Sequence, residues 1–116
     1  MSGMEFANTP EFQKDLKRLR KKYRSLNQDI AVVKQAIAAL PTGDGSKHWV
    51  VKNKVEDTYV MKMRMMCRSV KGAQFRLVYG YNQKTVTVLC LELYYKGDQV
   101  RETSDRIDEY LKRVDK

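Results

Sequence analysis

Residues 59–67, YVMKMRMMC, alternate between apolar and charged side chains. Because successive side chains of a β-strand point to opposite faces, this alternation predicts a strand with one face in a core and the other face exposed. The expected core-facing set is Met61, Met63, Met65 and Cys67, and the expected exposed set is Lys62, Arg64 and Arg68. This strand therefore predicts a β-sheet that presents several cations on one side.

Further strand-like segments surround this one. Residues 74–81 and 85–95 follow it, separated by short polar turns at 71–73 and 82–84, which is the spacing of an antiparallel meander. Residues 86–91, VTVLCL, would place apolar side chains on both faces of the sheet, as expected of a central strand. Two shorter strands are predicted at residues 4–7 and 49–51.

The N-terminal part of the chain predicts two helices. Thr9 is a suitable N-cap, with Pro10 at the first helical position and Glu11 in the first turn, and apolar residues at helical spacing continue to residue 23. A second helix is predicted over residues 25–40, where Ser25 and Gln28 match a capping box. The connection between these two helices, around residue 24, is very short, and so short a turn predicts that they form an antiparallel hairpin.

A closing helix is predicted after Gly97. Asp98 is its expected N-cap, and its apolar stripe is Val100, Ile107, Leu111 and Val114. The chain is therefore predicted to be α+β: an N-terminal helical hairpin packed on a small antiparallel β-sheet, with a C-terminal helix. We expect one domain over residues 1–116, in which residues 1–3 are a cloning remnant and Met4 is the native start.

Charge points to an anionic partner. The net charge is +9, and between Asp57 and Glu92 no acidic residue occurs. The cations in that interval are Lys62, Arg64, Arg68, Lys71, Arg76 and Lys84. A sheet face that carries several cations without counter-charges repels itself unless an anion binds to it, and a nucleic-acid backbone is the obvious polyanion.

Other classes of protein are excluded by the sequence. No apolar run approaches the roughly 20 residues that cross a bilayer, and the N-terminus has no signal-peptide pattern, so we expect a cytoplasmic protein that does not contact a membrane. Cys67 and Cys90 are expected to be buried free thiols. His48 is the single histidine and is expected to be a bystander in a loop, so we expect neither a metal site nor a cofactor.

Three segments, in this order and spacing, carry a resemblance to a known family. They are residues 5–16, EFANTPEFQKDL, residues 74–79, QFRLVY, and residues 91–96, LELYYK. Together they resemble the RelE/ParE superfamily of bacterial toxin–antitoxin toxins: the first strand and helix, the strand with an arginine after an aromatic residue, and the end of the central strand. The resemblance covers almost the whole chain and implies a RelE-like fold.

The resemblance implies two possible activities. RelE-like members are ribosome-dependent endoribonucleases that cut mRNA and are silenced by an antitoxin encoded beside them, whereas ParE-like members inhibit DNA gyrase. Because proteins of one fold can have different activities, the residues of the site must decide between these two activities. The cationic strand face favours a metal-independent mRNA interferase, with a cognate antitoxin, mRNA and the ribosome as partners. A gyrase inhibitor and a non-catalytic RNA-binding module are the alternatives.

RNA cleavage by 2′-hydroxyl attack needs a base, an acid and cations that stabilise the phosphorane. Arg76 is the expected stabilising cation, since a guanidinium matches phosphate oxygens, and it matches the catalytic arginine of the family. Lys62 and Arg64 match the family's basic pair, which orients RNA and helps proton transfer. We expect the neighbouring cations to lower the pKa of Lys62. A solvated basic face is the alternative for each of them.

The acid–base groups remain open at this stage. Tyr94 and Tyr95 end the last strand, where some family members have a histidine, and only one of them can face the site. A tyrosine at this position is expected either to stack on an RNA base or, beside several cations, to ionise readily enough to act as the general base. Glu92 is either a general base or a structural partner of Arg64 or Arg76. The expected RNA-binding cations are Arg68, Lys71 and Lys96, together with Lys17, Arg20 and Lys21 of the first helix.

Overall fold

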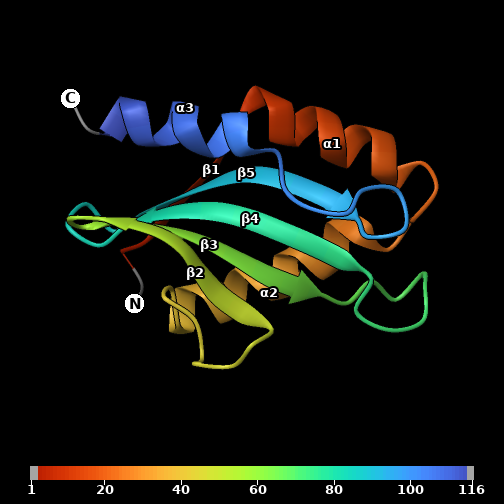
Figure 1. The fold of residues 1–116 in the computed structure, drawn as a ribbon. Helices are drawn as coiled ribbons and strands as arrows, with labels where there is room; N and C mark the ends of the chain where they lie inside the picture. The colour runs from red at the N-terminus through yellow and green to blue at the C-terminus, as the bar shows by residue number, and fades with distance from the viewer. Residues whose placement is uncertain (1–2, 115–116) are drawn as a thin grey trace.

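The computed structural model describes residues 3–114 and shows an α+β fold, as predicted (Figure 1). The elements in chain order are β1 (Glu5–Asn8), α1 (Pro10–Arg20), α2 (Leu26–Ala39), β2 (Trp49–Val55), β3 (Thr58–Met65), β4 (Phe75–Asn82), β5 (Thr87–Tyr95) and α3 (Ser104–Val114). The predicted cloning remnant, residues 1–3, lies outside the described part of the chain except for Gly3.

The five strands form one sheet in the order β1-β5-β4-β3-β2. Strands β2 to β5 make the predicted antiparallel meander, and β5 has a neighbour on each side, as its apolar sequence predicted. Strand β1 pairs with β5 in the parallel direction, with Phe6 opposite Val88, so the sheet as a whole is mixed. The four residues of β1 do not themselves specify a parallel or antiparallel pairing. The direction depends on how β5 runs after the chain turns back from β4.

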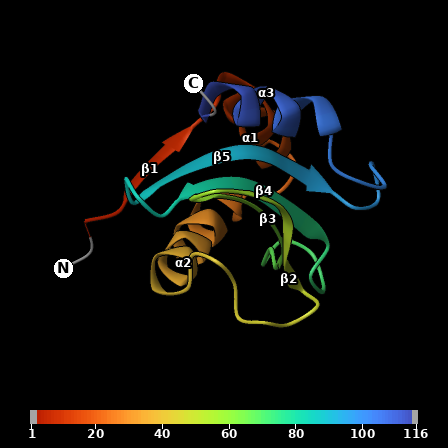
Figure 2. The ribbon, with the colours of Figure 1, turned by 60° about the vertical axis from the view of Figure 1, so that its left-hand side comes forward.

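The helices lie on both sides of the sheet. In Figures 1 and 2, α2 lies beneath the sheet, whereas α3 lies above it with α1 beside it. The core on the α2 side contains Met61, Met63, Met65 and Cys67, all buried, so the predicted core face of β3 is confirmed. A second, smaller core forms where Ile107 and Tyr110 of α3 pack on Val60, Val78 and Leu91.

Helix α1 begins as predicted and is tied to the other elements by one buried carboxylate. The Thr9 hydroxyl accepts a hydrogen bond from the Phe12 N–H at 3.0 Å, as an N-cap should. Asp15, 6% exposed, accepts from the Leu93 N–H at 3.1 Å and pairs with Arg106 at 2.6 Å. This carboxylate joins α1 to the part of β5 that extends beyond its pairing with β1, and it also joins α1 to α3.

Helix α2 starts at the predicted position but without the predicted capping hydrogen bond, and the predicted start of the closing helix is wrong. Ser25 has helical φ and ψ and makes no capping hydrogen bond; its hydroxyl donates instead to Asp29 at 2.7 Å, because Asp29 stands one turn along the helix. Helix α3 begins at Ser104 rather than after Asp98, and Val100 is 85% exposed instead of contributing to an apolar stripe. Residues 96–103 form a loop that is held by side chains of the sheet, as described below.

A glycine lets α3 approach the sheet closely. An added Cβ at Gly80 of β4 would lie 2.2 Å from the Tyr110 ring, so only glycine leaves room for that ring against the strand. Cys67 and Cys90 are both buried free thiols, as expected. None of the helices in residues 3–114 is long and apolar enough to cross a membrane.

Candidate active site

The predicted cations lie in register on adjacent strands. Arg64 of β3 stands opposite Arg76 of β4, and Arg76 stands opposite Tyr94 of β5. Lys62 is two residues from Arg64 on the same strand and stands opposite Val78. Directly opposed residues of neighbouring strands share a face of the sheet, so Lys62, Arg64 and Arg76 emerge on one side, opposite to the α2 core.

Helix α3 covers only part of this face. It packs on β4 and β5 through Ile107 and Tyr110, and the uncovered part of the face holds a cavity of about 220 Å³. The cavity is lined by Lys47, His48, Val50, Lys52, Lys62, Arg64, Arg76, Lys96 and Val100. Within residues 3–114 no carboxylate lines it. The expectation that cations of adjacent strands converge on one pocket is confirmed.

Arg76 is the most buried cation of the cavity, with 6% of its surface exposed. Its Nη1 group donates to the Ala73 carbonyl at 2.8 Å and to the Phe75 carbonyl at 3.0 Å. No acidic residue in the described part of the chain pairs with it, and burial together with the charge of Arg64 lowers its pKa. Its neutralisation is therefore left to an anion from outside, and the Nε and Nη2 hydrogens remain available to that anion.

Lys62 forms a salt bridge with Glu102, a carboxylate that the sequence analysis did not single out. Glu102, from the loop before α3, accepts a hydrogen bond from the Lys62 ammonium at 2.8 Å and lies 3.4 Å from Lys52. Burial would lower the pKa of Lys62, but the interactions with Glu102 and Tyr94 together outweigh burial and raise that pKa. The prediction of a lowered lysine pKa is wrong, because it counted the neighbouring cations and not this carboxylate.

The same contact defines the state of Glu102. Burial would raise the pKa of this carboxyl group, yet the hydrogen bond from Lys62 and the charges of Lys62 and Lys52 lower it to about 2. Glu102 lies in a mixed-sign stretch that is typical of a solvated helix surface, so the sequence carried no signal for this contact.

Tyr94, rather than Tyr95, is on the cationic face. Its side chain is 2% exposed, and the Lys62 ammonium lies 5.9 Å from the centre of its ring. Its hydroxyl is buried near the Lys62 ammonium but makes no well-formed hydrogen bond in residues 3–114, and burial raises its pKa despite the interaction with Lys62. The expectation that a tyrosine here ionises readily is wrong. Tyr95 lies on the other face, stacked on Tyr23 with ring centres 5.4 Å apart.

Glu92 has partners other than those expected. It is 3% exposed and accepts hydrogen bonds from the Gln99 amide at 2.8 Å, the Thr103 N–H at 2.7 Å and the Thr103 hydroxyl at 2.8 Å. It makes no ion pair with Arg64 or Arg76 and does not line the cavity. Its carboxylate instead holds the loop that ends with Glu102, which explains why α3 begins so late.

The predicted RNA-binding cations are dispersed. Lys96 lines the cavity. Arg68 does not share the face of Lys62, because β3 ends at Met65 and the alternation ends with it; Arg68 binds Asp29 of α2 at 3.1 Å on the opposite side. Lys71 is exposed in the loop between β3 and β4, outside the cavity lining, and Lys17, Arg20 and Lys21 are exposed at the C-terminal half of α1 and just after it.

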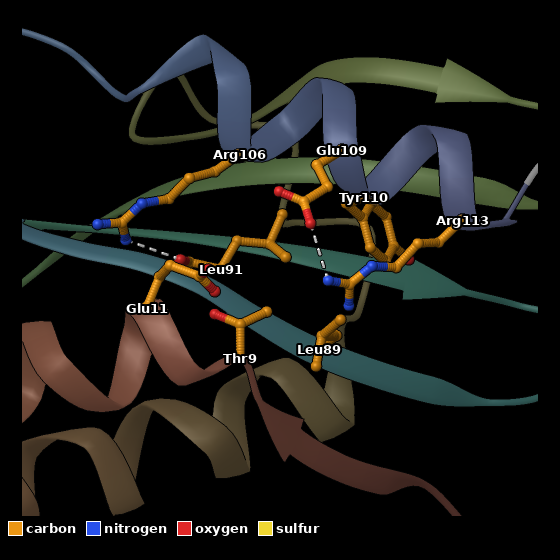
Figure 3. Close-up of a pocket in the computed structure, with 8 residues that line it drawn as sticks. All are labelled: Thr9, Glu11, Leu89, Leu91, Arg106, Glu109, Tyr110 and Arg113. Carbon is orange, nitrogen blue, oxygen red and sulfur yellow. Dashed lines mark hydrogen bonds and ion pairs between the residues drawn. The ribbon is translucent and has the colours of Figure 1, made fainter.

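A second cavity, of about 20 Å³, lies between α3 and the edge of β5 (Figure 3). Arg106 donates to the Leu91 carbonyl at 3.0 Å here, and Glu109 pairs with Arg113 at 3.0 Å. The space is about that of one water molecule, and four of its eight lining residues are joined by these two contacts, so it belongs to the packing of α3. No group of three His, Cys, Asp or Glu residues in positions 3–114 is arranged to hold a metal ion.

Two solved structures are similar to this chain. The RelE–RelB complex from the archaeon Pyrococcus horikoshii OT3 matches with a TM-score of 0.60 over 84% of this chain and 98% of the matched chain, at 15% identity. The chain has the RelE-like fold. The YoeB dimer from Staphylococcus aureus matches with a TM-score of 0.52 over 79% and 95%, also at 15% identity. No protein-family model matches the sequence, and no curated protein matches it significantly.

Residues from outside the recognised motifs complete the site on this RelE-like fold. Lys47 and His48 precede β2, and Lys52 lies within it; all three line the cavity with Arg76. The sequence predicted a loop for His48, and it could not show that β2 brings that loop beside β3. The signal that could have located them is strand register, because Trp49 stands opposite Met63 and so places its neighbours beside Lys62 and Arg64.

Proposed function

We propose that this chain is the toxin of a type II toxin–antitoxin module and cleaves ribosome-bound mRNA. The observation that carries the proposal is the convergence of Lys62, Arg64 and Arg76 on one cavity that no carboxylate of residues 3–114 lines. On a RelE-like fold, such a cavity suits a phosphodiester with its negative charge. Translation takes place in the cytoplasm, so the protein would act there.

The chemistry follows from the way the cations are held. Attack of a 2′-hydroxyl on the adjacent phosphorus creates a phosphorane whose extra negative charge must be stabilised. Arg76 is fixed by the Ala73 and Phe75 carbonyls through Nη1, which leaves a side of its guanidinium fork for two phosphate oxygens. Arg64 stands directly beside it in the sheet and adds a second charge. The products would be a 2′,3′-cyclic phosphate and a 5′-hydroxyl.

A protein partner is part of the same proposal. One of the similar structures is of RelE in complex with RelB, and we infer that this chain also has a cognate antitoxin. A chain with a net charge of +9 favours an antitoxin with acidic segments. The neighbouring reading frame should encode it.

The direct test is the fate of transcripts in cells that express the protein. Primer extension should reveal new 5′ ends within translated mRNA for the wild type and for Lys84→Ala, which removes an exposed cation far from the cavity. Arg76→Ala should leave the transcripts intact at equal protein level. Intact transcripts with the wild type would overturn the proposal; if plasmid supercoiling changed instead, the protein would be a gyrase inhibitor.

A non-catalytic RNA-binding protein would behave differently again. Wild type and Arg76→Ala would then both leave transcripts uncut, while the wild type would bind RNA more tightly than the variant in a filter-binding measurement. That result would also overturn the nuclease proposal.

A further inference from the structure

We propose that His48 is the general base of the cleavage reaction, an inference that rests on the proposed function. The sheet places it directly. Trp49 stands opposite Met63, and the Arg64 N–H donates to the His48 carbonyl at 2.8 Å, which extends the β2–β3 ladder by one residue. His48 therefore begins a cross-strand row that continues through Arg64, Arg76 and Tyr94.

Residues of one such row share a face of the sheet and lie about 5 Å apart between neighbouring Cβ atoms. Trp49, next along the chain, points into the α2 core, so His48 is on the cationic side. It lines the same cavity as Lys62, Arg64 and Arg76. A phosphodiester held by the two arginines would thus lie within reach of an imidazole.

The loop that carries His48 is held firmly. The Tyr79 hydroxyl donates to the Pro41 carbonyl at 2.7 Å and accepts from Trp49 Nε1 at 2.9 Å, which fastens the loop on both sides. Within the loop, Ser46 Oγ accepts from the His48 N–H at 3.2 Å. The backbone is therefore positioned, while the imidazole is exposed and makes no hydrogen bond with the described residues.

The other candidates for the base are less suitable. The Lys62 pKa is raised by Glu102, so this group stays protonated, and burial raises the Tyr94 pKa, so its hydroxyl stays neutral. Glu92 is committed to Gln99 and Thr103 outside the cavity. Histidine is the side chain whose charge normally changes between pH 5 and 8, and His48 is the one histidine of the chain.

The step balances with groups on the same face. An imidazole nitrogen of His48 takes the 2′-hydroxyl proton as O2′ bonds to phosphorus; the bond from phosphorus to the 5′-oxygen then breaks. The leaving oxygen takes a proton from the Lys62 ammonium. Water afterwards removes the proton from the imidazolium and restores the proton of Lys62.

The pH dependence must be read against the charges around the imidazole. They are Asp44 and Lys47 from its own loop, Lys52 from β2, Lys62 and Arg64 from β3, Arg76 from β4 and Lys96 after β5. Six cations and one carboxylate thus surround His48, and a neutral imidazole is the form that accepts a proton.

The experiment measures single-turnover cleavage of mRNA bound to purified ribosomes over pH 5 to 9. The wild-type rate should fall tenfold per pH unit below an acidic midpoint. His48→Ala should be on the order of 100-fold slower, should lose that acidic limb, and should recover rate when free imidazole is added. His48→Gln should be equally slow, and thermal unfolding should show that both variants fold.

The possible outcomes distinguish the role of His48 from the proposed nuclease activity. A wild type that cleaves, with a His48→Ala variant of equal rate or with an unchanged acidic limb, would overturn the role of His48 and leave the nuclease intact. A slow His48→Ala variant that imidazole does not rescue, and that keeps the acidic limb, would also overturn it. A wild type that cuts no ribosome-bound mRNA would overturn both proposals.

Discussion

Two cations of one cavity are held in contrasting ways. Arg76 is buried, is fixed by two backbone carbonyls and has no carboxylate partner in residues 3–114, whereas Lys62 is paired with Glu102 at 2.8 Å. A phosphate that enters the cavity can bind Arg76 without displacing a protein group, but it must compete with Glu102 for Lys62. Arg76 is therefore the residue on which binding of the scissile phosphate should depend most.

Tyr94 allows a prediction at the scale of one atom. Its buried hydroxyl makes no well-formed hydrogen bond in the described chain, although Lys62 lies nearby, and its ring packs in the smaller core with Ile107 and Tyr110 and faces the Lys62 ammonium. Tyr94→Phe removes the unsatisfied hydroxyl and keeps the ring, so the free energy of unfolding should stay equal or rise by about 1 kcal/mol. Chemical denaturation measures this.

Cleavage by Tyr94→Phe should stay within a few-fold of the wild-type rate, because His48 and Lys62 carry the proposed proton transfers and the Tyr94 hydroxyl carries none. Tyr94→Leu is the matched variant that removes the ring, and it should unfold more easily. A Tyr94→Phe variant that folds normally but cleaves about 100-fold more slowly would show that the hydroxyl takes part in the chemistry.

At the scale of elements, the loop at residues 96–103 borders the cavity. Glu92 holds it through Gln99 and Thr103, and Glu102 at its end closes on Lys62 and Lys52. Lys96 and Val100 of the same loop line the cavity. The loop thus contributes one cation to the site and places one carboxylate against two others.

The Glu102 contact predicts a dependence of stability on acid. Its pKa is about 2 in the folded protein, below its ordinary value of 4.5, so its contribution is fully present above about pH 4.5 and is lost as the pH falls toward 2. Glu102→Gln should lower the free energy of unfolding by about 2 kcal/mol at pH 7, less than the full shift implies because water reaches Lys52.

The difference between wild type and Glu102→Gln should shrink steadily when unfolding by urea is repeated between pH 5 and pH 2. Glu109→Gln, which removes an exposed carboxylate whose one salt bridge in residues 3–114 is with Arg113, is the control and should change little. A difference that stays constant over this pH range would mean that Glu102 is not held by the two lysines in solution.

Local patterns predicted some elements well and failed at others for identifiable reasons. The cap at Thr9 and the core face of Met61, Met63 and Met65 depend on residues close in sequence, and both are confirmed. The predicted start of α3 was wrong because Glu92, a residue of the preceding strand, accepts hydrogen bonds from Thr103. These bonds keep the segment after Asp98 out of the helix.

The site was predictable only in part, for the same reason. The parity of Lys62 and Arg64 follows from the strand itself, but Arg68 lies beyond the end of β3 and turns to Asp29 on the α2 side. The approach of Glu102 to Lys62 and the position of His48 beside Arg64 depend on contacts between distant segments. No pattern within a single segment carries that information.

At the scale of the whole molecule, charge is distributed unevenly. Asp15, Asp29 and Glu92 are buried and bind groups of the protein, so these three of the fourteen acidic residues do little to compensate the surface cations. The exposed cations of α1 lie toward the end of the molecule where Tyr23 stacks on Tyr95, next to Lys96. A net charge of +9 should therefore steer RNA toward the cavity.

This distribution predicts a strong dependence of RNA affinity on salt. Four cavity cations make no salt bridge within the described chain: Lys47, Arg64, Arg76 and Lys96. If each contacts one phosphate, affinity for a short single-stranded RNA should fall roughly 50-fold between 50 and 200 mM salt. Fluorescence anisotropy with a labelled RNA measures this.

Arg64→Ala should reduce the slope of log affinity against log salt by about 0.7, and Lys84→Ala, outside the cavity, should leave it unchanged. An affinity that is insensitive to salt, or an equal loss of slope in both variants, would show that RNA does not bind through the cavity cations.

The measurement that tests the central claim most directly is the single-turnover rate of mRNA cleavage on purified ribosomes by Arg76→Ala, compared with Arg68→Ala. Both variants remove one guanidinium, but Arg68 binds Asp29 on the opposite face. We expect Arg76→Ala to be on the order of 100-fold slower or more at saturating protein, with Arg68→Ala close to wild type once folding is verified. Equal rates for Arg76→Ala and wild type would contradict a scissile phosphate bound in this cavity.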